Sequence, residues 1–363
     1  MVQPSRRAVI GSLGGLLTGR VAGNAVGSDG QASEFWYRTF DDEYQCMDLV
    51  STDTGVLVLG RTGRDQEDDV WVASLDTGGE VRWTTNIEVS GRSDVISAVP
   101  AADGYVIAGE TGQSPGRWLV RLDTTGAEQW RKRPTRAGSL TDLTPHEGGY
   151  LAVGESGIDH DDSLSKIWVR AVDSSGTSRW ERSYKCDHAT SITPWDDGYL
   201  IAGAKRGDAW VQAIEDDGTP RSEHTYGGVG SENAHTAVGT DDGIVYLGLT
   251  ESIPRVDSRG MIVKTTRDGD FVWRRTYDME AVSGLVRTGD GFVAVGEPPF
   301  GSTDLDVETL VYTLDSRGRL RETVGLTSSV GDLTGVVRLN QNSVAVAGTE
   351  FSDGPWVRAV VLA

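Results

Sequence analysis

The segment Asp103-Gly104-Tyr105-Val106-Ile107-Ala108-Gly109 indicates the fold, because the chain repeats it. Clear copies begin at Gly148 and Asp197, and looser copies recur elsewhere. The final glycines of the seven copies are Gly60, Gly109, Gly154, Gly203, Gly248, Gly296 and Gly348. Successive copies are therefore 45 to 52 residues apart. A period of this length is typical of propeller blades and favours them over a helical solenoid.

Each repeat contains four short runs of strand-forming residues. In the second repeat they cover residues 94–99, 105–108, 118–122 and 128–131. Gly and Asp stand at the reversals between them, as tight hairpin turns require. No window of a dozen residues outside the first 30 shows the 3.6-residue period of an amphipathic helix. The repeat therefore predicts one blade of four antiparallel strands.

The two ends of the chain complete one blade between them. Residues 331–363 contain three predicted strands and no fourth, whereas residues 35–40 look like an isolated fourth strand. Joining them closes the ring and removes exposed strand edges. We expect an all-β fold, a seven-bladed β-propeller over residues 35–363 with four-stranded antiparallel blades, in which the N-terminal strand completes the last blade.

The turns before the fourth strands carry a further pattern. Asp-Thr-Thr-Gly at 123–126 precedes Trp130, and similar tetrapeptides precede Trp83 and Trp180. The pattern resembles the tryptophan-docking repeats of PQQ-like β-propellers, and most of all exported members of poorly characterised function. The resemblance implies a fold and not an activity. Quinone-dependent members hold PQQ with adjacent half-cystines and acidic metal ligands, but Cys46 and Cys186 stand far apart, so PQQ is not expected here.

The repeated tryptophans have two interpretations. Equivalent aromatic rings could stack on sugars, or they could pack one blade against the next. Their equivalent positions in the blades favour packing; they are Trp83, Trp130, Trp180 and Trp273. Trp195 has no equivalent in the other repeats and is expected in a turn, where it is a candidate ligand contact.

The charge balance restricts the possible partners. The chain has 34 Lys and Arg against 54 Asp and Glu, a net charge of −20. Such an acidic protein is not expected to bind nucleic acids or anionic membranes. An excess of carboxylates with scarce Lys is typical of salt-adapted surfaces. Most acidic side chains are therefore expected to serve solvation.

The first 25 residues resemble a twin-arginine export signal. Ser5-Arg6-Arg7 precedes a weakly apolar stretch over residues 8–18, and small residues suggest cleavage after Ala25. The alternative is a disordered terminus with an incidental arginine pair. Residues 26–34 would form a linker. No stretch reaches 18 apolar residues, so no transmembrane span is expected. We expect a monomer that is extracellular or at the cell surface.

The innermost strands place one residue of each repeat toward the channel. Strand alternation assigns the channel to Asp48, Ser97, Asp142, Ser191, Thr236, Gly284 and Gly335, and the next residue of each strand to packing between blades. Asp48 and Asp142 could bind Ca²⁺ with the hydroxyls and water, or only channel water. His188 and His235 are expected to face the same way from neighbouring blades. They could form a metal-binding or proton-transfer pair, or they could be two solvated side chains.

Acidic, uneven segments between second and third strands are the expected partner-binding face. They are residues 64–69, 158–163 and 302–308. Residues 267–270 resemble part of a calcium loop but fit a hairpin turn better. No nucleophile elbow, P-loop or zinc helix motif occurs.

Two functions remain open. The first is a non-catalytic binding or scaffold module for a protein, glycan or cation. The second is a metal-assisted enzyme at the channel mouth, with His160, His188 or His235 as base and Asp48 or Asp142 as acid or metal ligand.

Overall fold

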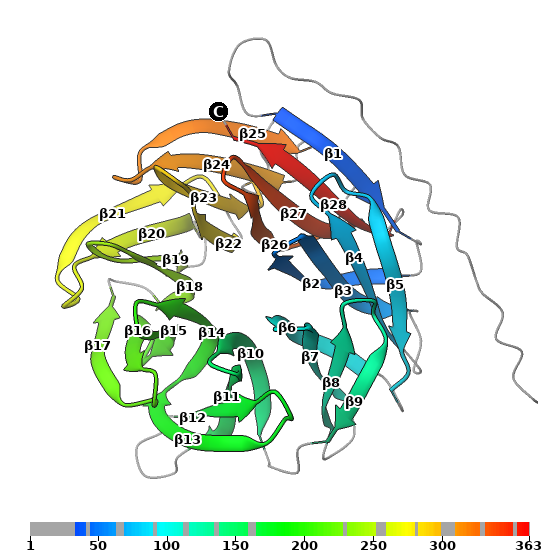
Figure 1. The fold of residues 1–363 in the computed structure, drawn as a ribbon. Coiled ribbons are helices and arrows are strands. Elements are labelled where there is room, and N and C mark those ends of the chain that lie inside the picture. The colour runs from blue at the N-terminus through cyan, green and yellow to red at the C-terminus, as the bar shows by residue number, and fades with distance from the viewer. Residues whose placement is uncertain are drawn as a thin grey trace, which may run out of the picture.

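The computed structural model describes residues 33–40, 44–62, 69–89, 93–111, 116–133, 138–158, 165–227, 231–251, 259–279, 282–298, 309–326, 331–350 and 354–362. All 28 elements within these ranges are strands, and they form seven four-stranded antiparallel sheets. The sheets stand as blades around a central axis (Figure 1). The predicted fold class is confirmed.

The first four blades follow the chain without interruption. Blade 1 comprises β2 (Tyr44–Thr52), β3 (Gly55–Thr62), β4 (Val70–Asp76) and β5 (Val81–Ile87). Blade 2 comprises β6 (Ser93–Ala101), β7 (Gly104–Thr111), β8 (Arg117–Asp123) and β9 (Glu128–Lys132). Blade 3 comprises β10 (Ser139–His146), β11 (Gly149–Ile158), β12 (Ser165–Asp173) and β13 (Ser178–Cys186). Blade 4 comprises β14 (His188–Trp195), β15 (Gly198–Lys205), β16 (Asp208–Glu215) and β17 (Pro220–Tyr226).

The remaining three blades complete the ring. Blade 5 comprises β18 (Ser231–Thr240), β19 (Gly243–Glu251), β20 (Arg259–Thr265) and β21 (Phe271–Tyr277). Blade 6 comprises β22 (Val282–Arg287), β23 (Gly291–Gly296), β24 (Thr309–Asp315) and β25 (Leu320–Leu326). Blade 7 comprises β26 (Gly331–Asn340), β27 (Ser343–Glu350), β28 (Gly354–Val361) and β1 (Ser33–Thr39).

The two ends of the described chain meet in blade 7. The blue strand β1 lies beside the red strand β28 in Figure 1, with Trp36 opposite Ala359. Two threonines of blade 7 also bind blade 1. The Thr334 hydroxyl donates to the Cys46 carbonyl (3.2 Å), and the Cys46 amide donates to Thr349 Oγ1 (2.8 Å). The last blade is thus joined to the first by hydrogen bonds as well as by packing.

The core lies between blades. Every residue of β3 from Gly55 to Gly60 is buried, because both faces of this strand meet neighbouring sheets. Outer strands such as β5 instead alternate between partly buried and exposed residues, since only one face packs. Successive blades bury their apolar side chains against each other, as Leu57 and Leu59 do with Val95 and Ile107.

The docking tryptophans join neighbouring blades at the outer strands. Trp83 of β5 donates its indole proton to the Thr124 carbonyl in blade 2 (2.8 Å). Its ring lies against Gly126, whose φ of +84° and lack of a Cβ permit this approach. Trp36 meets Thr77 of blade 1 in the same way (3.0 Å). These contacts favour packing over sugar stacking.

Two blades vary this contact. Gly176 faces Lys132 rather than Trp130, and Gly269 faces the imidazole of His224. Residues 267–270 lie in the β20–β21 hairpin, where the Asp270 amide donates to Thr266 Oγ1 (3.0 Å). The hairpin interpretation of that segment is confirmed.

Membrane-spanning helices are not found in the described residues.

Candidate functional site

Each innermost strand contains a β-bulge directly before its predicted channel residue. In β2 the register shifts between Cys46 and Asp48, and the same shift recurs in the other six blades. A bulge leaves one residue unpaired and turns the next side chain in a new direction. The residue after each channel position is buried, as predicted: Leu49, Ala98, Leu143, Ile192, Ala237, Leu285 and Val336.

The bulges place two carboxylates in a chain of hydrogen bonds across four blades. Asp48 of blade 1 accepts the Ala98 amide of blade 2 (3.1 Å). Ser97 of blade 2 donates its hydroxyl to Asp142 of blade 3 (2.9 Å). Asp142 in turn accepts the Ile192 amide of blade 4 (2.9 Å). The two predicted channel carboxylates therefore bind neighbouring blades together.

The same two carboxyl groups have raised pKa values. Burial and, to a smaller extent, the nearby Asp142 carboxylate together raise the pKa of Asp48 to about 7, against the hydrogen bonds from the Leu49 and Ala98 amides. Burial also raises the pKa of Asp142 to about 6, although three hydrogen bonds favour its ionised form. Raised carboxyl pKa values are found at catalytic acids and also in structural networks. Here every carboxylate oxygen accepts at least one hydrogen bond.

The two predicted histidines interact electrostatically. His188 begins β14 and His235 is the bulged residue of β18. Burial lowers the pKa of His235, and His188 lowers it further. The two rings are therefore close enough that a positive charge on one disfavours a positive charge on the other. In the part of the chain that the structure describes, no group of three or more His, Cys, Asp or Glu side chains could hold a metal ion.

The prediction that Trp195 lies in a turn is wrong. Trp195 is the last residue of β14 and is 6 % exposed. Its ring packs against Gly239 of blade 5, and the guanidinium groups of Arg221 and Arg267 lie 6.0 and 5.8 Å from the ring centre. The strand continues through Trp195, which carries this indole into the interface between blades 4 and 5.

Much of the predicted acidic face lies outside the described residues. This holds for His160, for residues 64–68, for residues 159–163 and for residues 302–308. Asp69 is described, and its carboxylate accepts the Val89 amide (3.3 Å). The described strand ends next to these segments are opposite to the ends that the turns between first and second strands join.

Two adjoining cavities open beside one turn that sequence reasoning did not single out. Cavity A, about 590 Å³, lies between blades 6 and 7. Cavity B, about 610 Å³, lies between blades 5 and 6. Both are lined by Thr288, Gly289 and Asp290, the turn between β22 and β23. Ligand pockets commonly have volumes of about 300–1,000 Å³, so each cavity suits a small ligand or one unit of a polymer.

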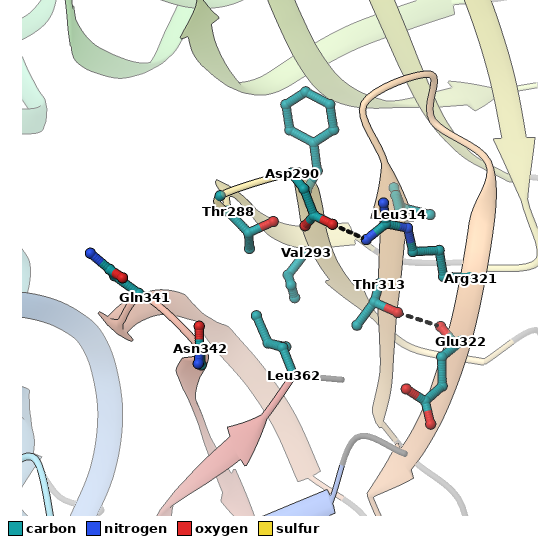
Figure 2. Close-up of a pocket in the computed structure, with 12 residues that line it drawn as sticks. Thr288, Asp290, Val293, Thr313, Leu314, Arg321, Glu322, Gln341, Asn342 and Leu362 are labelled. Atoms are coloured by element: carbon teal, nitrogen blue, oxygen red, sulfur yellow. Dashed lines mark hydrogen bonds and ion pairs between the residues drawn. The ribbon is translucent and has the colours of Figure 1, made fainter. Parts of the chain in front are cut away.

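Cavity A presents polar groups from two blades. Thr288 and Asp290 of blade 6 face Gln341 and Asn342 of blade 7, with Val293 and Leu362 between them (Figure 2). The Asp290 carboxylate accepts a hydrogen bond from Arg321 (2.5 Å), which also lines this cavity. The walls thus offer an ion pair, amides and a hydroxyl around an apolar floor.

Cavity B contains more cationic than anionic side chains. Its cations are Lys264, Arg275, Arg287 and Arg317, and its anions are Asp241, Asp242 and Asp290. Lys264 bonds both oxygens of Asp242 (2.7 and 2.8 Å), which lowers the pKa of that carboxyl. Arg287 pairs with Asp241 (3.1 Å). This local excess of cations contrasts with the net charge of −20 for the whole chain.

A weak signal in the sequence points to these cavities. Arg275, Arg287 and Arg317 all occur in repeats 5 and 6, but they belong to different strands and turns. Their convergence depends on how adjacent blades face each other, and a single sequence does not show that.

Known proteins resemble this chain in fold alone. The sequence matches no protein-family model and no curated protein. The structure is similar to the AfRom2 CNH domain, with a TM-score of 0.52 and 10% identity over 91% of this chain and 99% of that one. It is also similar to acylaminoacyl peptidase from Pyrococcus horikoshii, with a TM-score of 0.53 and 13% identity over 86% of this chain and 51% of that one.

Proposed function

We propose that this protein is an exported, salt-adapted β-propeller that binds a polar ligand at the cell surface without transforming it. The observation that carries the proposal is that cavities A and B share the Thr288–Asp290 turn, so that two polar cavities lie on either side of one turn. The site lies at the turns between first and second strands, and not on the acidic segments that the sequence predicted as the partner-binding face.

The hydrogen bonds of the two inner carboxylates support a structural role for these groups in the ring. Asp48 accepts two hydrogen bonds from backbone amides, and Asp142 accepts two from amides and one from Ser97. Through these bonds the Asp48 and Asp142 carboxylates join neighbouring blades. The fold itself does not separate binding from catalysis, because propellers serve both.

Gly289 offers a direct test of binding in the cavities. It lines both of them, and a Cβ built on it would have no atom within 4 Å. Gly289→Trp should therefore obstruct the cavities without disturbing the fold. Ala102→Trp is the matched control, because Ala102 is an exposed residue at the same place in the blade 2 turn.

The purified full-length protein would be screened by thermal shift against neutral and acidic oligosaccharides. A ligand present at about 100 times its Kd adds about 2.7 kcal/mol to the free energy of unfolding. We expect the shift to vanish in Gly289→Trp and to persist in Ala102→Trp. Ligand binding that survives Gly289→Trp, or catalytic turnover of the bound ligand, would overturn the proposal.

A metal-assisted enzyme at the channel mouth is the second candidate. The raised pKa values of Asp48 and Asp142 favour it, because a carboxyl group with a pKa near 6 or 7 can donate a proton at neutral pH. It requires activity that Asp142→Asn abolishes in a folded protein and that Gly289→Trp leaves intact.

A further inference from the structure

Two arginine side chains in cavity B have no acidic partner among the described residues. Arg275 donates through Nε to the Arg317 carbonyl (2.9 Å), which leaves both terminal nitrogens without a described hydrogen bond. The Arg317 side chain is exposed and has no described hydrogen bond or ion pair. Both line the cavity, so two guanidinium forks are available to a ligand.

The position of Arg275 is defined by its surroundings. Its guanidinium carbon lies 5.9 Å from the centre of the Trp273 ring, and its Nε is held by the blade 6 turn. A guanidinium group fixed on one side presents its remaining donors in a plane that suits a carboxylate or sulfate. The three acidic side chains of the cavity are already paired, with Arg287, Lys264 and Arg321.

The rest of the lining suits a ring with hydroxyl groups. Thr288 and Ser316 contribute hydroxyls, and the paired carboxylates can accept further hydrogen bonds. Val272 is 47 % exposed and lines the same cavity beside Trp273, which provides an apolar surface for C–H groups. An acidic peptide would place several carboxylates close together, and Asp241 and Asp290 would repel some of them. A sugar acid has only one carboxylate per ring.

We propose that cavity B binds the acidic sugar units of a polysaccharide, with the carboxylate of a uronate held by Arg275 and Arg317. This inference rests on the proposed function and names its ligand class. Cavity A would then receive the neighbouring sugar unit, because the two cavities adjoin along the Thr288–Asp290 turn.

The probes are trigalacturonate and its methyl ester, which has the same shape without the negative charges. Binding to the full-length protein would be measured by calorimetry at constant ionic strength. We expect trigalacturonate to bind and the ester to bind at least about 10-fold more weakly, as expected when charge-assisted hydrogen bonds are lost.

The variants Arg275→Gln and Arg317→Gln should each weaken trigalacturonate binding by about 10-fold. Arg317→Gln is the safer variant, because its side chain has no described contact to lose. Arg319→Gln is the matched control, since Arg319 lies in the same hairpin, carries the same charge and does not line the cavity. It should bind like the unaltered protein.

Three results would overturn this inference. They are equal binding of the acid and the ester, equal losses in Arg317→Gln and Arg319→Gln, and binding of polyglutamate in place of trigalacturonate. The proposed function would survive any of them if another ligand still bound in a manner sensitive to Gly289→Trp. It would fail separately if no ligand depended on Gly289.

Discussion

Asp142 Oδ2 accepts the amide proton of Ile192 at 2.9 Å across the boundary between blades 3 and 4. A carboxylate placed toward the channel by a β-bulge therefore forms a bond within the ring itself. The equivalent bond from Asp48 to Ala98 joins blades 1 and 2. Residues that look like a ligand site in the sequence are thus part of the contact between blades.

These carboxyl groups should make stability depend on pH. Their folded pKa values, about 7 and about 6, lie above the ordinary 3.8, so the folded state binds protons more tightly than the unfolded state. Their stabilising contribution is fully present below about pH 3.8 and is lost as the pH rises through 6 and 7. We therefore expect these two groups to make the free energy of unfolding fall from about pH 4 to about pH 7.

Chemical denaturation across that range would check this dependence. Asp48→Asn should flatten the fall in the free energy of unfolding, because the replacement does not titrate. His235 acts in the opposite direction below pH 6.5, since its lowered pKa disfavours the cation in the folded state. The comparison is therefore made between the slopes of the two proteins. Identical slopes would contradict the assignment.

Calcium should not stabilise the ring through Asp48 and Asp142. Their oxygens already accept amide and hydroxyl protons, whereas Ca²⁺ needs six or more oxygen ligands. We expect equal thermal midpoints in chelator and in Ca²⁺ at constant ionic strength. A rise that Asp142→Asn removes would instead favour the enzyme alternative.

The docking glycines should tolerate no side chain. Gly126 has a φ of +84°, and a Cβ there would lie 2.5 Å from Trp83 Cε3. Gly126→Ala should reduce the free energy of unfolding by about 1–3 kcal/mol, from backbone strain and overlap with the indole. Gly289→Ala is the control and should cost little. Thermal unfolding measures both, and equal midpoints would contradict this account of the docking contact.

The junction between the last and first blades depends on Thr349. Its hydroxyl oxygen accepts the buried Cys46 amide proton at 2.8 Å. Thr349→Val keeps the shape but leaves that amide without its partner, which should cost about 1–3 kcal/mol. Thr225→Val, on an exposed position of β17, should change stability little. A similar effect of both variants in urea unfolding would show that the hydrogen bond does not matter.

Export should depend on the arginine pair near the N-terminus. The change of both Arg6 and Arg7 to Lys should retain the uncleaved precursor inside the cell, because twin-arginine signals require the pair. The exported protein should begin at Val26, as read by mass spectrometry of the secreted fraction. An unprocessed N-terminus, or export unaffected by the change, would contradict the signal.

The sequence predicted the parts of the structure that depend on local pattern. The Asp-Gly-Tyr repeat marks one hairpin of each blade, and strand alternation separates Asp48 from the buried Leu49. It also predicted the tryptophan contacts, since Trp83 stands at the same place in its repeat as Trp180. It failed for Trp195, because the end of a strand is poorly marked and burial there depends on Gly239 of the next blade.

The number of blades, the strands within each and the closure of the ring are predictable from the sequence alone, because they follow from repeat spacing and alternation along one chain. The side chains that meet between blades are known only from the three-dimensional structure. Arg275 and Arg317 are 42 residues apart and belong to different blades, yet a hydrogen bond joins them at 2.9 Å in one cavity. Such contacts depend on the packing angle of neighbouring sheets, and no periodic pattern in the sequence of either strand indicates that angle.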